Sequence, residues 1–169
     1  MPELAIHLTK RADGGAVLRL VRADGSATWQ RHDGHRGGFF PAHDLTHLAI
    51  ETELGFRRGF YGLVAEGWSL EETEGKSARG PLPPETVTVE YLVGALDLER
   101  AGGVEWTAAE FNEHAARFAD GRNLTVPALT DAELACVRAR VRELLGRWGT
   151  LPRGGTLELT FDRPTPGPP

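Results

Sequence analysis

Two histidines four residues apart are the residues of this sequence best placed to do chemistry together. His43 and His47 stand in the pentapeptide HDLTH, which occupies residues 43–47. Side chains four residues apart on a helix lie on the same face, one turn above the other. At this spacing two imidazoles can bind one metal ion, since neutral histidine is a common metal ligand. The spacing therefore predicts a divalent metal site at His43 and His47.

The pentapeptide resembles the His-Glu-x-x-His helix of the zincin metallohydrolases, with Asp44 in place of the glutamate. In that motif the two histidines bind zinc and the acid activates a metal-bound water. In the gluzincin branch a third ligand, a glutamate, lies on the next helix, and Glu66 follows His47 at about that distance. The resemblance covers residues 40–68 and implies that His43, His47 and Glu66 are metal ligands, with Asp44 as general base.

Two other residues are alternative third ligands, and the preceding segment adds further donors. Glu51 lies one turn beyond His47 on the same helix, and His114 flanks the apolar face of a later helix. The segment before the motif contains His32, Asp33 and His35. Nitrogen and oxygen donors suit zinc best, although the ligand types also fit manganese, iron or nickel. Three protein ligands leave one position for a water whose pKa the metal lowers toward ~7.

A second interpretation assigns no chemistry to the motif. In it the chain is a non-catalytic binding or interaction domain, and His43 and His47 are hydrogen-bonded packing residues. The first interpretation requires the two rings to converge on one point together with a third nitrogen or oxygen donor. The second predicts that the rings cap, stack or pair with a core carboxylate, and it would be established if both rings donated to backbone carbonyl groups.

Composition excludes several other kinds of function. The chain has 169 residues and a single cysteine, Cys136, so it can form neither an intramolecular disulfide nor a cysteine-based zinc site. Its net charge of −5 argues against nucleic acid as a partner, because phosphate binding needs a basic surface. We expect a small-molecule or peptide substrate. No phosphate-binding loop, dinucleotide fingerprint or nucleophile elbow occurs in the sequence.

The sequence also lacks signals for export or membrane insertion. No apolar run approaches the ~20 residues that cross a bilayer, and the N-terminus does not have the pattern of a signal peptide. We therefore expect a cytoplasmic protein that does not act at a membrane. The frequent use of Ala, Gly, Arg and Pro indicates a bacterial origin with a GC-rich genome.

The elements that must position the histidines form an α+β fold. The sequence predicts a small antiparallel sheet of three N-terminal strands and one C-terminal strand, packed against four to five helices. Asp24-Gly25 favours a tight hairpin between the second and third strands. The expected strands are Leu4–Lys10, Ala16–Arg22, Ser26–Arg31 and Thr156–Phe161, all within a single domain of residues 1–161. The Pro-rich tail 162–169 is expected to be disordered.

Helix signals place the motif on the first of five helices. It should begin near Pro41 and end near Gly55, with Leu45, Leu48 and Ala49 facing one side and the two histidines the other. We expect a tightly packed second helix over 59–68, where glycines allow close backbone approach, and a third over 85–100. Two capping boxes, at Thr107 and Thr130, open the last two helices.

The entrance to the site is expected beside a polar loop. Residues 71–84 contain Gly and Pro and are expected to form a flexible flap, next to which a substrate would enter. Aromatic side chains at Phe39, Phe40 and Trp68 are candidates to line that entrance.

Overall fold

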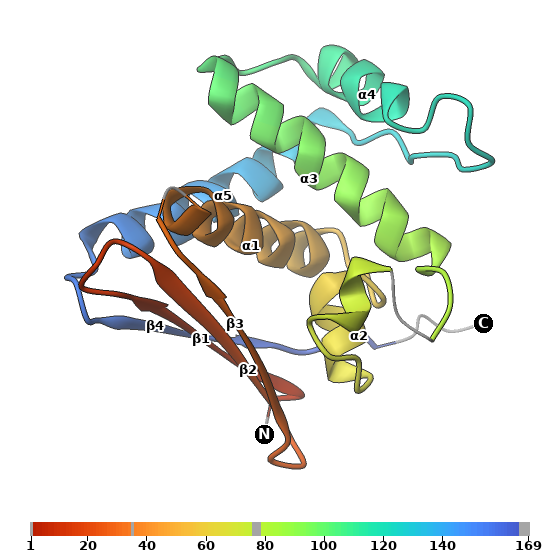
Figure 1. The fold of residues 1–169 in the computed structure, drawn as a ribbon. Coiled ribbons are helices and arrows are strands. Elements are labelled where there is room, and N and C mark those ends of the chain that lie inside the picture. Colours follow the sequence, from red (N-terminus) through yellow and green to blue (C-terminus); the bar gives the residue numbers. More distant parts are fainter. Residues whose placement is uncertain (1, 35, 76–78, 166–169) are drawn as a thin grey trace.

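Four antiparallel strands form one sheet, as the sequence predicts. The computed structural model describes residues 2–34, 36–75 and 79–165 (Figure 1). The strand order is β3-β2-β1-β4, so the C-terminal strand joins the N-terminal meander at its free edge. The third strand begins one residue later than expected, because Ser26 belongs to the turn, where its backbone N–H donates to Asp24 Oδ1. The strands are β1 (Leu4–Lys10), β2 (Ala16–Arg22), β3 (Ala27–His32) and β4 (Thr156–Phe161).

The sheet buries one face against the helices and leaves the other open. Along β1 and β4 every second side chain is buried, which is the alternation expected of a half-covered sheet. In Figure 1 the helices all lie on one side of the sheet. On the open side, Trp29 of β3 is largely exposed. The helical elements are α1 (Arg36–Glu53), α2 (Phe60–Ala65), the short 3-10 turn η1 (Glu72–Glu74), α3 (Pro84–Gly102), α4 (Ala108–Arg117) and α5 (Asp131–Thr150).

Helix α1 is the central element, because it lies between two hydrophobic clusters. Leu45, Leu48 and Ala49 pack into the cluster formed with the sheet, whereas Ile50 packs into the cluster formed with α3, α4 and α5. Figure 1 shows α1 between the sheet and α3, with α5 alongside. The predicted division of this helix into an apolar side and a side that carries the histidines is confirmed.

The start of α1 differs from the prediction. The helix begins at Arg36 and contains Pro41 in its second turn, although a proline was expected to open it. Proline removes one backbone hydrogen bond at this position. Aromatic contacts hold the additional turn: the Phe40 ring stacks on His32 at 4.4 Å between centroids, and the Phe39 ring stacks on His43 at 5.5 Å.

Helix α2 is shorter than predicted but packs as closely as expected. It ends at Ala65, because Gly67 turns the chain with a φ of 100°. A side chain at Gly62 would place its Cβ 2.0 Å from the carbonyl oxygen of Arg57, and one at Gly59 would lie 2.3 Å from the carboxyl carbon of Glu51. Both glycines therefore permit contacts that no other residue would allow.

The remaining helices follow the sequence signals. Helix α3 includes the strand-like stretch Thr86–Val89, where burial of Val89 between helices outweighs β propensity. Both predicted capping boxes are present, with Thr107 and Glu110 opening α4 and Thr130 and Glu133 opening α5. Residues 162–165 have no regular secondary structure, whereas 166–169 of the predicted tail lie outside the described residues, as does His35. None of the described helices has the length and apolarity to span a membrane.

Candidate functional site

Helices α1 and α3 run in opposite directions and bring two histidines against two acidic residues. His43 lies opposite Asp97, and His47, one turn further along α1, lies opposite Glu90. Glu90 and Asp97 are seven residues apart, so they share one face of α3. This pairing places an alternating group of imidazoles and carboxylates between the two helices.

His43, His47 and Glu90 form a group that could hold a metal ion. One ligating atom from each of the three lies within 4.8 Å of the other two. His47 Nε2 and Glu90 Oε1 are 3.3 Å apart. That separation is roughly the one between two ligands of a single tetrahedral zinc ion with bonds of ~2.0–2.1 Å. The sequence analysis did not single out Glu90, since only the packing of α3 on α1 brings it to the histidines.

Asp97 fixes the orientation of the His43 ring. His43 Nδ1 lies 2.7 Å from Asp97 Oδ2, and Arg100 donates to Asp97 Oδ1 at 2.5 Å. Burial raises the pKa of Asp97, but the hydrogen bonds and charges of His43 and Arg100 outweigh it and hold the pKa below its ordinary value. Because an ionised carboxylate only accepts, His43 Nδ1 is the donor, which leaves Nε2 as the nitrogen for a metal.

His47 lies between two glutamates. Its Nδ1 is 3.5 Å from Glu51 Oε1, and its Nε2 faces Glu90. Burial lowers the pKa of His47, but the negative charges of Glu90 and Glu51 outweigh burial and raise this pKa to about 10. For Glu90 the two effects are reversed. Burial raises its pKa, but the positive charge and hydrogen bond of His47 outweigh burial and hold the pKa below its ordinary value.

Glu51 is held behind His47 by the start of α2. It is fully buried, and its two carboxylate oxygens accept hydrogen bonds from the backbone N–H groups of Tyr61 and Gly62 at 3.2 and 3.1 Å. The space for this carboxylate exists because Gly59 has no side chain. Glu51, one of the predicted alternative ligands, therefore lies on the Nδ1 side of His47 and not on the side of Glu90.

Asp44 is a buried carboxylate directed into a cavity. Its residue surface is only 6% exposed, and its Oδ2 forms no hydrogen bond within the described part of the chain. His32 Nε2 lies 3.8 Å from this oxygen. Burial raises the pKa of Asp44 to about 7 against the opposing charges of His43 and His47.

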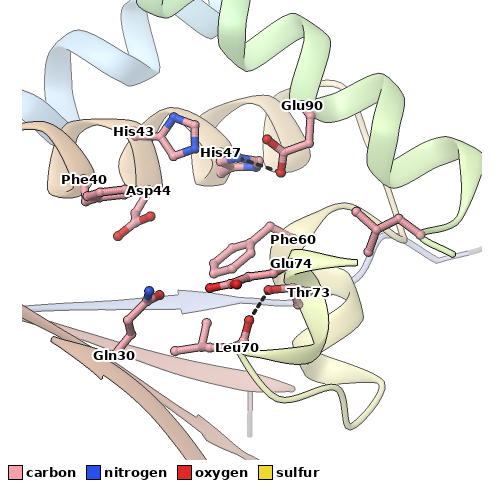
Figure 2. Close-up of a pocket in the computed structure, with 11 residues that line it drawn as sticks. Gln30, Phe40, His43, Asp44, His47, Phe60, Leu70, Thr73, Glu74 and Glu90 are labelled. Carbon is pink, nitrogen blue, oxygen red and sulfur yellow. Dashed lines mark hydrogen bonds and ion pairs between the residues drawn. The ribbon is translucent and has the colours of Figure 1, made fainter. Parts of the chain in front are cut away.

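The cavity beside these residues has a volume of about 400 Å³ (Figure 2). Its roof is α1 with Glu90 of α3, and Gln30 of β3 faces Asp44 from below. Of the predicted entrance residues, Phe40 lines it, whereas Phe39 and Trp68 are not among the described lining residues. Described residues of the predicted loop over 71–84 form one wall of the cavity. The lining consists of Gln30, Phe40, His43, Asp44, His47, Phe60, Leu70, Thr73, Glu74, Leu82 and Glu90.

The structure does not bring the other predicted ligands to the histidines. Glu66 caps the end of α2, where its carboxylate pairs with Arg58 and Arg163. It lines a separate hollow on the surface rather than the cavity below α1. His114 stacks on Trp106 at 3.9 Å between ring centroids, in the cluster around α4. The spacing in sequence that suggested Glu66 does not determine where its side chain points. Helix α2 ends at Ala65, and the carboxylate of Glu66 is directed to the two arginines instead.

The polar contacts found for both rings are with carboxylates. Within the described residues neither His43 nor His47 donates to a backbone carbonyl. Both the metal-site interpretation and the structural interpretation allow pairing with carboxylates. Comparison of the chain with protein-family models, with curated proteins and with solved structures found no match. The function must therefore be argued from the site itself.

Proposed function

We propose that this protein is a metal-dependent hydrolase with a divalent ion bound by His43, His47 and Glu90. The observation that carries the proposal is the convergence of three ligating atoms within 4.8 Å of one another at the wall of a cavity. Two imidazole nitrogens and one carboxylate oxygen suit zinc best, and the ligand types also admit manganese, iron or nickel.

The residues behind the ligands support this assignment. In metal sites a ligating histidine almost always donates its second ring nitrogen to a carboxylate, a carbonyl or a water, which orients the ring and raises its basicity. Asp97 stands in this position for His43 at 2.7 Å. Glu51 lies on the corresponding side of His47, where its Oε1 is 3.5 Å from Nδ1, although Nδ1 forms no hydrogen bond within the described residues. Both carboxylates are largely buried, so their positions are set by the packing of the helices.

Besides a bound metal ion, hydrolysis of this kind requires a general base. Three protein ligands leave one coordination position for water, and a bound divalent ion makes that water a better nucleophile. A general base must reach the proton of the water directly or through one further water. Asp44 is next to His43 in sequence, lines the same cavity and has an oxygen free of hydrogen bonds within the described residues. We assign it the role of accepting that proton.

The alternative is a non-catalytic domain in which the same groups are ion pairs that join α1 to α3. His43 with Asp97 and His47 with Glu90 would then contribute only to helix packing. This alternative gives Asp44 no role, although burial of a carboxylate oxygen without a hydrogen bond costs stability. We favour the metal site because it uses all of these groups.

The test begins with protein purified without an affinity tag, stripped of metal and reloaded with zinc or manganese. Its activity is measured on chromogenic carboxylic esters, phosphate esters and amino-acid anilides. We expect metal-dependent hydrolysis of one class. Asp44→Asn should keep the metal and lose roughly 10²- to 10⁴-fold in rate, the usual contribution of a general base.

Two further variants separate binding from folding. His47→Ala should lose both metal and activity, whereas Glu66→Gln, which removes a carboxylate outside the cavity, should lose neither. A fully metal-loaded protein that hydrolyses none of the three classes, or an Asp44→Asn variant with full activity, would overturn the proposal.

A further inference from the structure

The cavity has a second acidic wall opposite the histidines. Glu74, at the end of η1, lines it, and Figure 2 shows its carboxylate beside the Phe60 ring, on the far side of the cavity from α1. Within the described residues this carboxylate has no hydrogen bond and no ion pair. The neighbouring Glu72, by contrast, pairs with Arg79 at 3.0 Å.

The turn that carries Glu74 is held firmly in place. Ser69 and Glu72 cap it reciprocally: the Ser69 backbone N–H donates to Glu72 Oε2 at 2.7 Å, and the Glu72 backbone N–H donates to Ser69 Oγ at 3.2 Å. Thr73 Oγ1 donates to the carbonyl of Leu70 at 2.6 Å. The Leu70 N–H donates to Thr28 Oγ1 and so ties the turn to β3. These contacts fix the backbone of the turn that carries Glu74, whose exposed side chain lines the cavity.

The charge of the cavity favours one class of substrate. Its described lining contains the carboxylates of Asp44, Glu74 and Glu90 and includes neither lysine nor arginine. A divalent ion at the histidines would offset part of this charge, whereas the Glu74 carboxylate, which has no cationic partner within the described residues, would keep its own. A phosphate or carboxylate on the substrate would meet repulsion there, whereas an ammonium group would be attracted. The face of an aromatic ring such as Phe60 also attracts cations.

We propose that the substrate carries an ammonium group, which binds Glu74 while the group to be hydrolysed lies at the metal. This inference rests on the proposed function and adds the substrate class, an amine such as a small amino-acid derivative or the amino end of a peptide. Glu74 then determines specificity and takes no part in the chemistry. The carboxylate accepts hydrogen bonds from the ammonium, and Phe60 covers its carbon chain.

Hydroxamates test the inference, because they bind the metal of such sites and their far ends can be varied. Dissociation constants are measured by calorimetry on the zinc-loaded protein for ω-aminohexanohydroxamate, for heptanohydroxamate, which has a methyl in place of the ammonium, and for pimelic acid monohydroxamate, which has a carboxylate. A shorter pair, ω-aminobutanohydroxamate and pentanohydroxamate, places the ammonium closer to the metal. Acetohydroxamate, which has no far end, reports on the metal alone.

We expect the ammonium compound of at least one pair to bind roughly tenfold more tightly than its methyl counterpart, and the carboxylate compound to bind most weakly. In Glu74→Gln the preference should vanish while acetohydroxamate binds as before. Glu71→Gln is the matched control, since it removes the same charge from the same turn but lies outside the described lining. In that variant the preference should remain.

The contrary outcomes are distinguishable. If acetohydroxamate binds but neither pair shows an ammonium preference, or if the preference survives in Glu74→Gln, the substrate class is wrong and the metal-dependent hydrolase stands. If acetohydroxamate does not bind to protein incubated with zinc, the metal site itself is wrong and the substrate class falls with it.

Discussion

Four carboxylates surround the two imidazoles, and their different surroundings give them different roles. Glu90, the third ligand of the proposed metal site, is partly exposed and lines the cavity. Asp97 and Glu51 lie behind the rings and are held by an arginine and by backbone N–H groups, respectively. Asp44 Oδ2 has no hydrogen bond from any described residue, and the side chain points into the cavity. Residue type alone does not separate these roles, whereas burial and hydrogen-bond partners do.

Removal of the carboxylate behind His43 should weaken metal binding without removing a ligand. We expect Asp97→Ala to lower zinc affinity roughly 10- to 100-fold, because the freed ring can rotate and its Nε2 becomes less basic. Competition with a chromogenic chelator measures the affinity, and circular dichroism verifies the fold. Glu66→Gln should bind zinc like the parent protein. An unchanged affinity in Asp97→Ala would mean that His43 does not bind the metal in the orientation that Asp97 imposes.

At the scale of elements, the sequence predicts the secondary structure of each segment more accurately than it predicts how the segments pack together. The strands follow from their turns and the last two helices from their capping boxes, since these signals are local. The face of α1 also follows from local periodicity, and so His43 and His47 could be found. Glu90 could not, because it becomes a partner only when α3 packs antiparallel to α1. Its one sequence signal, the seven-residue spacing to Asp97, has meaning only once that packing is known.

The start of α1 and the end of α2 show the same limit. Pro41 has a strong local preference for a first turn, yet ring stacking of Phe40 on His32 of β3, a contact between separate elements, extends the helix before it. Glu66 has the right spacing for a ligand, but the turn at Gly67 and the ion pair with Arg58 place it elsewhere.

The close approach of α2 to the chain before it should make one glycine indispensable. In Gly62→Ala the new Cβ would lie 2.0 Å from the carbonyl oxygen of Arg57, which is backbone and cannot rotate away. We expect the free energy of unfolding to fall by about 1–3 kcal/mol, as for other overpacked sites. Urea denaturation followed by circular dichroism measures this value.

A second glycine provides the control for that variant. Gly146 lies in α5 with nothing within 4 Å of a Cβ, so Gly146→Ala should raise stability by about 0.5–1 kcal/mol through helix propensity. If Gly62→Ala leaves stability unchanged or raises it as Gly146→Ala should, the contact between α2 and the Arg57 carbonyl is not as close as the structure has it.

On the scale of the whole molecule, α1 joins the two hydrophobic clusters, and its histidines lie where α3 meets it. A metal that bridges α1 and α3 would bind the folded chain and not the unfolded one, so binding adds to the free energy of unfolding. At a free metal concentration a hundred times the dissociation constant the gain is about 2.7 kcal/mol.

That gain should appear as a rise in the melting temperature. For a chain of this length it corresponds to roughly 5–10 °C, which differential scanning fluorimetry detects. A chelator should reverse the rise, and His47→Ala should not show it. A shift of equal size in His47→Ala would place the stabilising metal elsewhere on the protein.

The central claim is that three named side chains hold one metal ion, and anomalous X-ray scattering from zinc-soaked crystals tests it most directly. The account predicts a single strong anomalous peak between α1 and α3, about 2.0–2.1 Å from Nε2 of His43, from Nε2 of His47 and from a carboxylate oxygen of Glu90. Crystals of the folded protein at saturating zinc with no peak at these three side chains would contradict it.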